Sequence, residues 1–217
     1  MDSNQLAAMI DHTILRSEAV SEDIKTKCQE AVEHKFASVC VNPSFVRLAS
    51  KELADSEVKV CTVVGFPFGD STSESKAFET RNAIKNGAQE IDMVINLGAL
   101  KSEAWDVVKD DINIVVREAR EKRVVKVIIE TCYLTEEEMK KACQIIKEVG
   151  ADFVKTSTGF GTAGAKVEDI KLIKEVVGDE VGIKASGGIK TEADAVKMIE
   201  AGATRIGTSF GVEIVNS

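Results

Sequence analysis

The stretch Val181-Gly182-Ile183-Lys184-Ala185-Ser186-Gly187-Gly188-Ile189 runs from an apolar, β-rich segment through a lysine into a pair of glycines. After a helical pattern over Glu192–Glu200, a second such segment, Thr204–Thr208, leads into the glycine-bearing loop Gly207-Thr208-Ser209-Phe210-Gly211. Glycine-rich loops after the last strands are typical of the phosphate-binding end of a (β/α)8 barrel. An open dinucleotide-binding sheet would instead carry G-x-G-x-x-G after its first strands, and this chain has none there. These loops therefore favour a closed barrel.

Strand and helix patterns alternate along the whole chain, which predicts a parallel sheet with helices on its outside. The predicted strands are Met9–Ile14, Ala37–Val41, Val58–Val64, Glu90–Asn96, Val124–Glu130, Asp152–Lys155, Val181–Ala185 and Thr204–Thr208. The predicted helices are Glu22–Glu33, Ser44–Leu53, Ser73–Asn86, Glu103–Glu121, Glu136–Val149, Val167–Val176 and Glu192–Glu200, and Thr135-x-x-Glu138 and Thr191-x-x-Asp194 are typical helix starts. We predict a single α/β domain over residues 1–217, a TIM (β/α)8 barrel with an additional N-terminal helix over Asn4–Ala8.

The composition argues against several classes of protein. The formal net charge is −8 and no run is dense in lysine or arginine, so neither nucleic acid nor an anionic membrane is expected as a partner. Residues 1–5 lack the basic start of a signal peptide, and no stretch approaches the roughly 18 apolar residues of a membrane span, so we expect a cytoplasmic protein. The five cysteines show no C-x-x-C spacing, which predicts free thiols rather than disulfides or a zinc site.

Two lysines, Lys155 and Lys184, end apolar, strand-like runs. A buried ammonium costs several kcal/mol unless it is paired or loses its proton, so this placement is unfavourable for a structural role. A second cation nearby and partial burial both favour the neutral amine, which can attack a carbonyl. The pair therefore predicts Schiff-base chemistry, which requires no metal and no cofactor.

The alternation of side chains between the two faces of a strand predicts which residues point into the barrel. In the fourth strand, Ile91, Met93 and Ile95 suit the helix-facing side, which leaves Asp92, Val94 and Asn96 inside. Barrel interiors are normally filled by Val, Ile and Leu, so inward charged groups indicate a functional site. By the same alternation, the residues of each of the following sets share one face of their strand: Lys126 with Glu130, Cys40 with Asn42, Phe153 with Lys155, and Lys184 with Gly182 and Ser186.

Several of these groups also have a purely structural interpretation. For Asp92 alone, an ion pair with a lysine explains the carboxylate equally well, although two lysines with one obvious partner weaken that interpretation. Lys126 and Glu130 suit a supporting or substrate-orienting role.

Cysteine chemistry is the weaker hypothesis. Cys40 suits a small buried residue better than a nucleophile, because neither His12 nor His34 has a sequence context that marks it as a base. On the first strand, Asp11 is a better candidate for the site than His12.

Bond making or breaking beside an iminium requires an acid–base group close to the reacting carbon. Asp92 together with Lys184 fits that role. The backbone amides of the last two loops, with a short helix start, fit a phosphate cradle. The residues themselves therefore predict a Schiff-base aldolase.

The chain resembles the deoxyribose-phosphate aldolases, the class I aldolases of the DeoC type, in motifs spread over nearly its whole length. The matching motifs are Ile10–Thr13, Val39–Pro43, Val64–Gly69, Glu90–Asn96, Lys126–Thr131, Phe153–Phe160, Lys184–Ile189 and Arg205–Ser209. The two lysine motifs together are highly specific, whereas either alone is modest.

This resemblance implies the reversible cleavage of 2-deoxy-D-ribose 5-phosphate to acetaldehyde and D-glyceraldehyde 3-phosphate. It implies that Lys155 forms the Schiff base, and that Asp92 and Lys184 transfer protons with a bound water while Lys184 also favours the neutral amine of Lys155. The resemblance also implies that Gly187, Gly188, Gly207 and Ser209 bind the phosphate, and that Asp11, Cys40, Lys126 and Thr158 support the pocket. Family members form dimers or tetramers, so a homodimer or homotetramer is expected, with a sugar phosphate and aldehydes as small-molecule partners.

Two departures from the family pattern concern the pocket. Some members carry lysine where this chain has Phe160, so one cation is missing from the pocket rim. Some also carry a C-terminal tyrosine that reaches the site, whereas the only tyrosine here is Tyr133. Proton transfer at the acetaldehyde carbon is therefore expected to rely on Asp92, Lys184 and water.

Other functions remain open from the residues. One is another lysine Schiff-base barrel, such as a transaldolase-like transferase or an aldolase for a longer sugar phosphate. The other is a phosphate-ligand-binding barrel without turnover, against which Asp92, Lys155 and Lys184 argue. An enediol isomerase would need a Glu/His base pair at strand ends, which His12 and His34 do not obviously supply.

Overall fold

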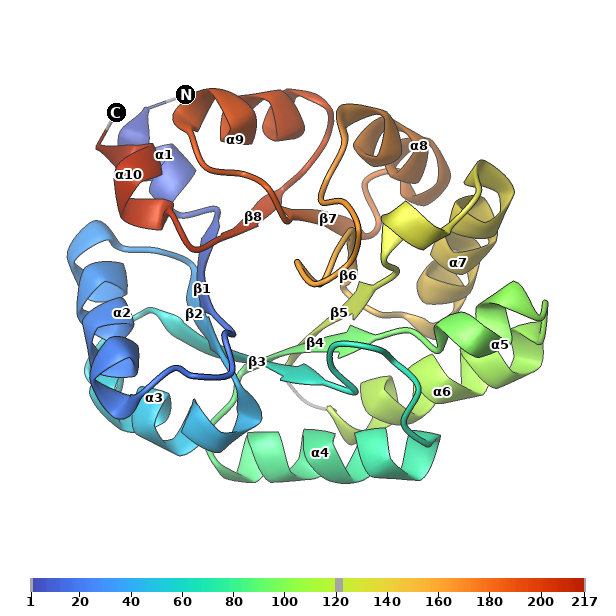
Figure 1. Ribbon diagram of the computed structural model, residues 1–217, viewed down its shortest axis with the longest axis horizontal. Coiled ribbons are helices and arrows are strands. Elements are labelled where there is room, and N and C mark those ends of the chain that lie inside the picture. Colours follow the sequence, from blue (N-terminus) through green and yellow to red (C-terminus); the bar gives the residue numbers. More distant parts are fainter. Residues whose placement is uncertain (1, 120–122, 217) are drawn as a thin grey trace.

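Eight parallel strands close into a barrel in the computed structural model, which describes residues 2–119 and 123–216 (Figure 1). The strands are β1 (Ile10–Ile14), β2 (Ser38–Val41), β3 (Lys59–Val64), β4 (Glu90–Val94), β5 (Val124–Ile128), β6 (Phe153–Lys155), β7 (Gly182–Ser186) and β8 (Arg205–Thr208). The barrel closes where β8 pairs with β1, with Ile206 opposite Ile10. The predicted TIM (β/α)8 barrel is confirmed.

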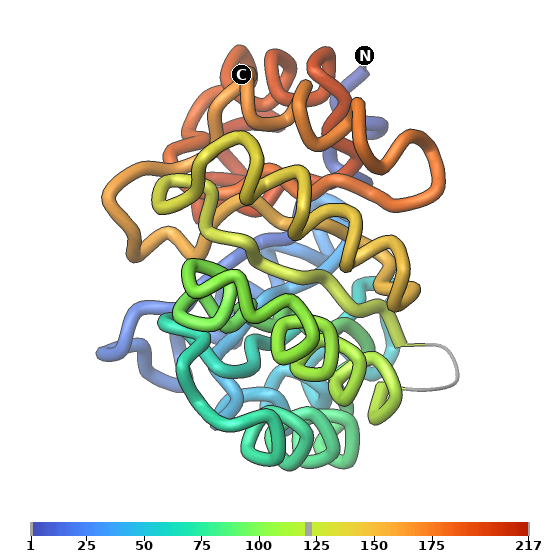
Figure 2. The backbone as a smooth tube through the Cα atoms, turned by 90° about the vertical axis from the view of Figure 1, so that its right-hand side faces the viewer, coloured from blue at the N-terminus to red at the C-terminus, as the bar shows by residue number. Residues whose placement is uncertain are grey.

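Helices form a ring around the outside of the strands (Figure 1). They are α1 (Ser3–Ala7), α2 (Ser21–His34), α3 (Val46–Glu52), α4 (Ser73–Lys85), α5 (Leu97–Lys101), α6 (Trp105–Glu118), α7 (Glu136–Val149), α8 (Val167–Val177), α9 (Glu192–Glu200) and α10 (Gly211–Val215), with 3-10 turns η1 (Pro43–Phe45) and η2 (Thr131–Tyr133). The N-terminal helix α1 packs against α10, so both ends of the chain lie on one side of the molecule (Figure 2). Within the described ranges, every helix is too short or too polar to cross a membrane.

Local sequence signals set several helix ends. At the start of α7, the Glu138 N–H donates to Thr135 Oγ1 at 3.3 Å while the Thr135 N–H donates to the Glu138 carboxylate at 2.8 Å. Thr191 and Asp194 form the same capping box at α9. Both predicted helix starts are therefore confirmed, and each fixes where the preceding loop leaves the barrel.

The sheet separates an apolar outer core from a polar interior. Ile91, Met93 and Ile95 are fully buried in the core between the strands and the helices. Asp92 points the other way, into the barrel, where it meets lysines from other strands. The predicted alternation along β4 is therefore confirmed for these residues.

The alternation fails where strands end earlier than predicted. β4 ends at Val94, and Asn96 does not point into the barrel but caps α5, its Oδ1 accepting the Ala99 N–H at 2.9 Å. β5 ends at Ile128, and Glu130 lies beyond it with a left-handed backbone, φ 51°. The direction of a side chain follows strand parity only while the backbone stays extended.

Helix boundaries also differ in places. The predicted helix Ser44–Leu53 begins as the 3-10 turn η1 before α3, and Glu103–Glu121 corresponds to α6. The last two residues of that prediction, Arg120 and Glu121, lie outside the described residues. The short helices α5 and α10 were not predicted, because each is little more than one turn long and shows no clear helical period, although the equally short α1 was predicted.

Candidate active site

Charged side chains rather than aliphatic layers fill the centre of the barrel. Lys126, Lys155 and Lys184 come from the adjacent strands β5, β6 and β7, and each is at most 3% exposed. Lys155 and Lys184 are direct partners in the register of β6 with β7. The two lysines that the sequence singled out therefore lie side by side.

The Asp92 carboxylate lies at the centre of these lysines. Its Oδ2 accepts hydrogen bonds from Lys155 Nζ at 2.8 Å and Lys184 Nζ at 2.7 Å, and its Oδ1 accepts one from Lys126 Nζ at 2.8 Å. Burial alone would raise the pKa of the Asp92 carboxyl, but the three ammonium groups hold that pKa well below its usual value. Asp92 is therefore an ionised carboxylate with three cationic donors.

Lys184 has a second carboxylate partner that sequence reasoning did not assign. Its Nζ donates to Asp11 Oδ2 at 2.5 Å, from β1. Burial would lower the pKa of Lys184, but Asp11 and Asp92 raise that pKa above its usual value. Lys184 is therefore held as an ammonium group between two carboxylates.

His12 faces the opposite side of β1 from Asp11. Its Nε2 lies 2.7 Å from Glu30 Oε2 on α2, and its ring packs against Phe36. His34 stacks on the same phenylalanine. Both imidazoles thus lie outside the barrel interior, which favours Asp11 over His12 as a site residue.

Cys40 is a small buried residue of the interior, as predicted. Its side chain is fully buried and packs with Cys61 on the neighbouring strand β3. Contact with the Cys61 side chain lowers the pKa of Cys40. The Cys61 thiol also donates to Asp92 Oδ1 at 3.2 Å, a contact that the sequence did not predict.

Lys126 contacts three carboxylates. Its Nζ lies 2.5 Å from Glu90 Oε2, 2.8 Å from Asp92 Oδ1 and 3.4 Å from Asp11 Oδ2. Burial would lower the pKa of Lys126, but Asp11 and Asp92 raise it well above its usual value. This environment suits a permanent cation that holds the carboxylates in place.

Glu130, which shares the parity of Lys126, contacts the loop after β6 instead. The Thr158 N–H donates to Glu130 Oε1 at 3.2 Å, and the Thr158 hydroxyl donates to Oε2. The Phe160 N–H in turn donates to Thr158 Oγ1 at 3.0 Å. Because this loop directly follows Lys155, Glu130 and Thr158 fix its path at the edge of the site.

Within the ion-pair cluster, the sequence reasoning missed two charged residues, Glu90 and Arg205. Arg205 Nη1 lies 2.6 Å from Asp11 Oδ1 and 3.0 Å from Glu90 Oε2. Parity could have found both: Glu90 lies two positions before Asp92, and Arg205 lies two positions before Gly207. Their ion pairs extend the cluster to the first residues of β4 and β8.

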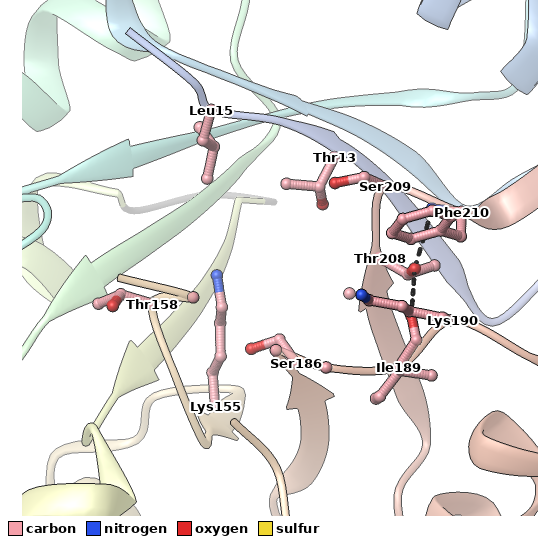
Figure 3. A pocket seen from close by; sticks show the side chains of 14 residues that line it. Thr13, Leu15, Lys155, Thr158, Ser186, Ile189, Lys190, Thr208, Ser209 and Phe210 are labelled. Carbon is pink, nitrogen blue, oxygen red and sulfur yellow. Dashed lines mark hydrogen bonds between the residues drawn. The ribbon is translucent and has the colours of Figure 1, made fainter. Parts of the chain in front are cut away.

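A cavity of about 190 Å³ opens above the cluster at the carboxyl ends of the strands. Figure 3 shows the Lys155 side chain pointing into it, with Ser186 beside the lysine and Thr208 and Lys190 farther along the wall. Its lining includes all the predicted phosphate-binding residues, Gly187, Gly188, Gly207 and Ser209, together with Thr158 and the unpredicted Thr13, Leu15, Ile189 and Phe210. The amine and the glycine loops therefore face one space.

Glycine is required in this wall for space and for conformation. A Cβ at Gly207 would lie 2.9 Å from Lys184 Cε, so any side chain there would displace the lysine. Gly187 has φ 85°, a left-handed conformation that other residues rarely adopt. Both glycines line the cavity.

Lys190 is a cation at the cavity wall that sequence reasoning missed. It follows the Gly187–Gly188 loop, and its Nζ lies 5.6 Å from the centre of the Phe210 ring. Phe160, in contrast, is 57% exposed and packs edge-on against Phe66. The positive charge at the cavity therefore comes from the β7 side rather than from the β6 loop.

Over residues 2–119 and 123–216, thiol and carboxylate atoms that could bind a metal form two groups, Cys40–Cys61–Asp92 and Asp11–Cys61–Glu90. Lys126 Nζ lies among these atoms, 3.4 Å from Cys61 Sγ and 2.8 Å from Asp92 Oδ1. A metal ion would have to displace this ammonium group. The described residues thus fit an ammonium cluster better than a metal centre.

Comparison with known proteins places this geometry in a family. A profile of the DeoC/LacD family aldolases matches residues 5–216. The deoxyribose-phosphate aldolase of Clostridium tetani is 61% identical over 211 residues, which cover 97% of this chain and 98% of that protein. The enzyme of the same name from Carboxydothermus hydrogenoformans is 59% identical, over 99% of this chain and 96% of its own.

A solved structure has the same fold. The deoxyribose phosphate aldolase from Aeropyrum pernix, described as a tetramer, aligns with a TM-score of 0.93 at 32% identity, over 100% of this chain and 92% of its own. The likeness extends over the whole barrel, including the strands that carry the lysine cluster. With its closed barrel, its buried lysines and near-complete alignment to these relatives, the chain belongs to the DeoC/LacD family of aldolases.

Proposed function

We propose that the chain, as one aldolase domain over residues 1–217, reversibly cleaves 2-deoxy-D-ribose 5-phosphate to acetaldehyde and D-glyceraldehyde 3-phosphate through a Schiff base on Lys155. The observation that carries the proposal is the position of Lys155. Its amine lies 2.8 Å from Asp92 and lines the same cavity as Gly187, Gly207 and Ser209. The near-full-length relatives named deoxyribose-phosphate aldolase support the choice of substrate.

The Lys155 amine attacks C1 of the open-chain sugar, and loss of water gives an iminium ion. The C3 hydroxyl then loses its proton, the C2–C3 bond breaks, and the bonding electrons move to the iminium nitrogen to form an enamine. D-Glyceraldehyde 3-phosphate leaves. A proton is added at C2, and water hydrolyses the new iminium to release acetaldehyde and the free amine, so one water is lost and one is regained.

Asp92 and Lys184 are placed to move these protons. In this proposal the Asp92 carboxylate accepts the C3 hydroxyl proton through a bound water, and the pair returns a proton to C2. Asp92 Oδ2 and Lys184 Nζ lie 2.7 Å apart, which supports direct transfer between them. Asp11 and Lys126 hold the pair in place by their own ion pairs.

The phosphate group binds at the far wall of the cavity. The proposed donors are the backbone amides of Gly187 and Gly188, after β7, of Gly207, near the end of β8, and of Ser209, between β8 and α10. Lys190 supplies a positive charge beside them. Because C3, C2 and C1 lie four, five and six bonds from the phosphorus atom, one cavity of about 190 Å³ accommodates both ends of the substrate.

Reductive trapping tests the Schiff base directly. The protein is incubated with acetaldehyde and borohydride, and the adduct is located by peptide mass spectrometry. We expect a two-carbon adduct on Lys155 that disappears in Lys155→Leu and persists in Lys171→Leu, a change at an exposed lysine. Scattered labelling of surface lysines would contradict the mechanism.

A substrate comparison then separates related aldolases. We expect cleavage of 2-deoxyribose 5-phosphate at least tenfold faster, by kcat/KM, than cleavage of fructose 6-phosphate or other ketose phosphates. A preference for ketose phosphates would identify a transaldolase-like enzyme on the same Schiff-base site.

We further infer that the protein works in the cytoplasm as a homodimer or homotetramer. Five free cysteines, four of them buried, suit a reducing compartment. A tetrameric relative at 32% identity and exposed aromatic side chains such as Phe68 and Phe78 support self-association. Sedimentation velocity at micromolar concentration tests the assembly, and a monomer would refute it.

A further inference from the structure

The interior of the barrel holds more positive than negative charge. Among the residues described, one connected set of ion pairs contains four cations, Lys126, Lys155, Lys184 and Arg205, and three carboxylates, Asp11, Glu90 and Asp92. With all seven groups ionised, this cluster carries a net charge of +1. Uncompensated buried charge is costly, and the cluster becomes neutral when one lysine is a free amine.

The three lysines differ in how many carboxylates hold them. Lys126 forms ion pairs with Asp11, Glu90 and Asp92, and Lys184 with Asp11 and Asp92. For Lys155, the ion pair found in the described part of the chain is with Asp92. Lys155, the lysine that reaches the cavity, is therefore the one of the three that the fewest carboxylates hold.

Glu90 and Arg205 contribute to this charge count from outside the cavity. They are the first residues of β4 and β8, whereas the cavity lies at the other ends of the strands. Arg205 is coupled to Lys184 because both contact Asp11, through Oδ1 and Oδ2 respectively. Glu90 is coupled to Asp92 because both contact Lys126.

We infer that Arg205 and Glu90 are positioning residues that set, through this ion-pair cluster, the pH at which the Lys155 amine becomes free to react. Arg205 supplies the excess cation that makes loss of the Lys155 proton favourable. Glu90 limits that excess. The inference rests on the proposed function for its catalytic meaning, but the charge balance itself does not depend on the substrate.

The two residues should act in opposite directions. Without the Arg205 charge, three cations face three carboxylates, so freeing the amine would leave a net negative charge and would require a higher pH. Without the Glu90 charge, four cations face two carboxylates, so the amine would be freed at a lower pH. Removing the charge of Arg205 or Glu90 from this cluster should shift the pH at which half of the Lys155 amine is free by on the order of half to one pH unit.

Other titratable groups also surround Lys155, and all of them stay in place in both variants. They are Asp11 on β1, Cys40 on β2, Cys61 on β3, Asp92 on β4, Lys126 on β5, Lys184 on β7, and Glu130 and Lys190 in the flanking loops. Ionisation of the thiols contributes equally to each profile. It therefore cannot produce shifts of opposite sign.

Competitive acetylation measures the free amine without requiring turnover. Wild type, Arg205→Met, Glu90→Gln and the double variant are treated with trace acetic anhydride between pH 6 and 11, and labelling of the Lys155 peptide is quantified by mass spectrometry. We expect an alkaline shift of the labelling midpoint in Arg205→Met, an acidic shift in Glu90→Gln and a near wild-type midpoint in the double variant. Arg205→Lys keeps the charge and should keep the midpoint.

Unmoved midpoints, or shifts in the same direction, would overturn the inference, because a merely structural role predicts no opposed shifts. Urea unfolding of each variant identifies any that fail to fold, and Glu90→Gln with Arg205→Lys then decides the question. The acid limb of kcat/KM for 2-deoxyribose 5-phosphate should move with the labelling midpoints. Opposed labelling shifts without any cleavage would refute the proposed function alone.

Discussion

The carboxylate of Asp92 lies 2.8 Å from the amine of Lys155, although their strands β4 and β6 are separated by β5. The contact is possible because side chains from non-adjacent strands converge on the axis of a closed barrel. The group proposed to move protons is therefore in contact with the proposed nucleophile before any substrate binds. Such preorganisation reduces the rearrangement needed at the moment of reaction.

Replacing Asp92 with asparagine removes this carboxylate at nearly constant volume. We expect kcat for cleavage of 2-deoxyribose 5-phosphate to fall by about 10²- to 10⁴-fold, the usual contribution of a positioned acid–base group. Steady-state kinetics at pH 7 measure the change, with Asp110→Asn on the exposed face of α6 as the matched control. Turnover that survives intact in Asp92→Asn would exclude the proton-transfer role.

Removing the charge of Lys190 should affect substrate binding rather than chemistry. Lys190→Met is expected to raise KM for 2-deoxyribose 5-phosphate by roughly 5- to 30-fold, the loss of one charge-assisted contact. The kcat/KM for unphosphorylated 2-deoxyribose should not change, because that sugar has no group at the far wall. Lys197→Met, exposed on α9, is the control, and equal effects on both sugars would argue against a phosphate contact.

Phe160 is a position at which a cation can be added. The residue is exposed and directly follows Gly159, which lines the cavity. We expect Phe160→Lys to lower KM for the phosphorylated sugar several-fold, with a larger effect at low ionic strength because exposed charges are screened by salt. Val107→Lys adds the same charge on the exposed face of α6, away from the residues that line the cavity or the pocket beside Phe160, and an equal drop in KM there would point to a nonspecific effect of net charge.

A fully buried ion pair joins α4 to α6 beside the site. Lys76 Nζ lies 2.6 Å from Asp111 Oδ2 and donates to the Val94 carbonyl at 2.9 Å, at the end of the strand that carries Asp92. Asp111→Asn leaves the buried ammonium without its charge partner, so we expect a loss of about 3–5 kcal/mol in the free energy of unfolding.

Urea denaturation measures this loss. The exposed pair Lys109–Glu148 provides the comparison, because Glu148→Gln should cost less than about 1 kcal/mol. Similar losses in the free energy of unfolding for Asp111→Asn and Glu148→Gln would show that the buried ion pair contributes no more to stability than the exposed one.

His12 makes stability depend on pH. Burial lowers the pKa of His12 from its usual 6.5 to about 4, against the opposing effect of Glu30. Since the folded pKa is depressed, the unfolded chain binds the proton first, and stability is lost as the pH falls from about 6.5 to about 4. Between pH 7 and pH 5 this effect amounts to about 2 kcal/mol.

The contribution of His12 is isolated by comparison with His12→Gln. We expect urea unfolding of the variant to lose about 2 kcal/mol less between pH 7 and pH 5 than that of the wild type, because the titrating ring is gone. Carboxylates other than Glu30, whose pKa is lowered in part by its contact with His12, titrate alike in both proteins. Parallel pH profiles would contradict a buried, neutral His12.

Much of the site could be predicted from one-dimensional patterns. Asp92 was placed inside the barrel by its alternation with Ile91 and Met93, and Lys155 and Lys184 stood out because each ends an apolar run. The same reasoning failed at Asn96, where the chain leaves the strand and the side chain caps α5 instead. The alternation predicts which face of a strand a residue occupies, but it does not predict at which residue the strand ends.

The partners within the site could not be predicted in this way. Lys184 contacts Asp11, 173 residues away in the sequence, and Arg205 contacts Glu90, 115 residues away. Alternation can place each of them inside the barrel, yet it says nothing of which neighbour lies at the same height. That depends on the register of all eight strands and on the closure of β8 onto β1.

The sequence by itself determined the barrel, the two lysines, the inward carboxylate and the late glycine loops, because hydrophobic period, helix caps and glycine conformation are local properties of the chain. Only the tertiary structure decided which carboxylate holds which ammonium, how four cations share three carboxylates, and that Lys190 after β7, rather than a residue of the loop after β6, supplies a cation to the cavity wall. Those outcomes depend on distances across a closed barrel, and Coulomb energies in a buried cluster change steeply with such distances.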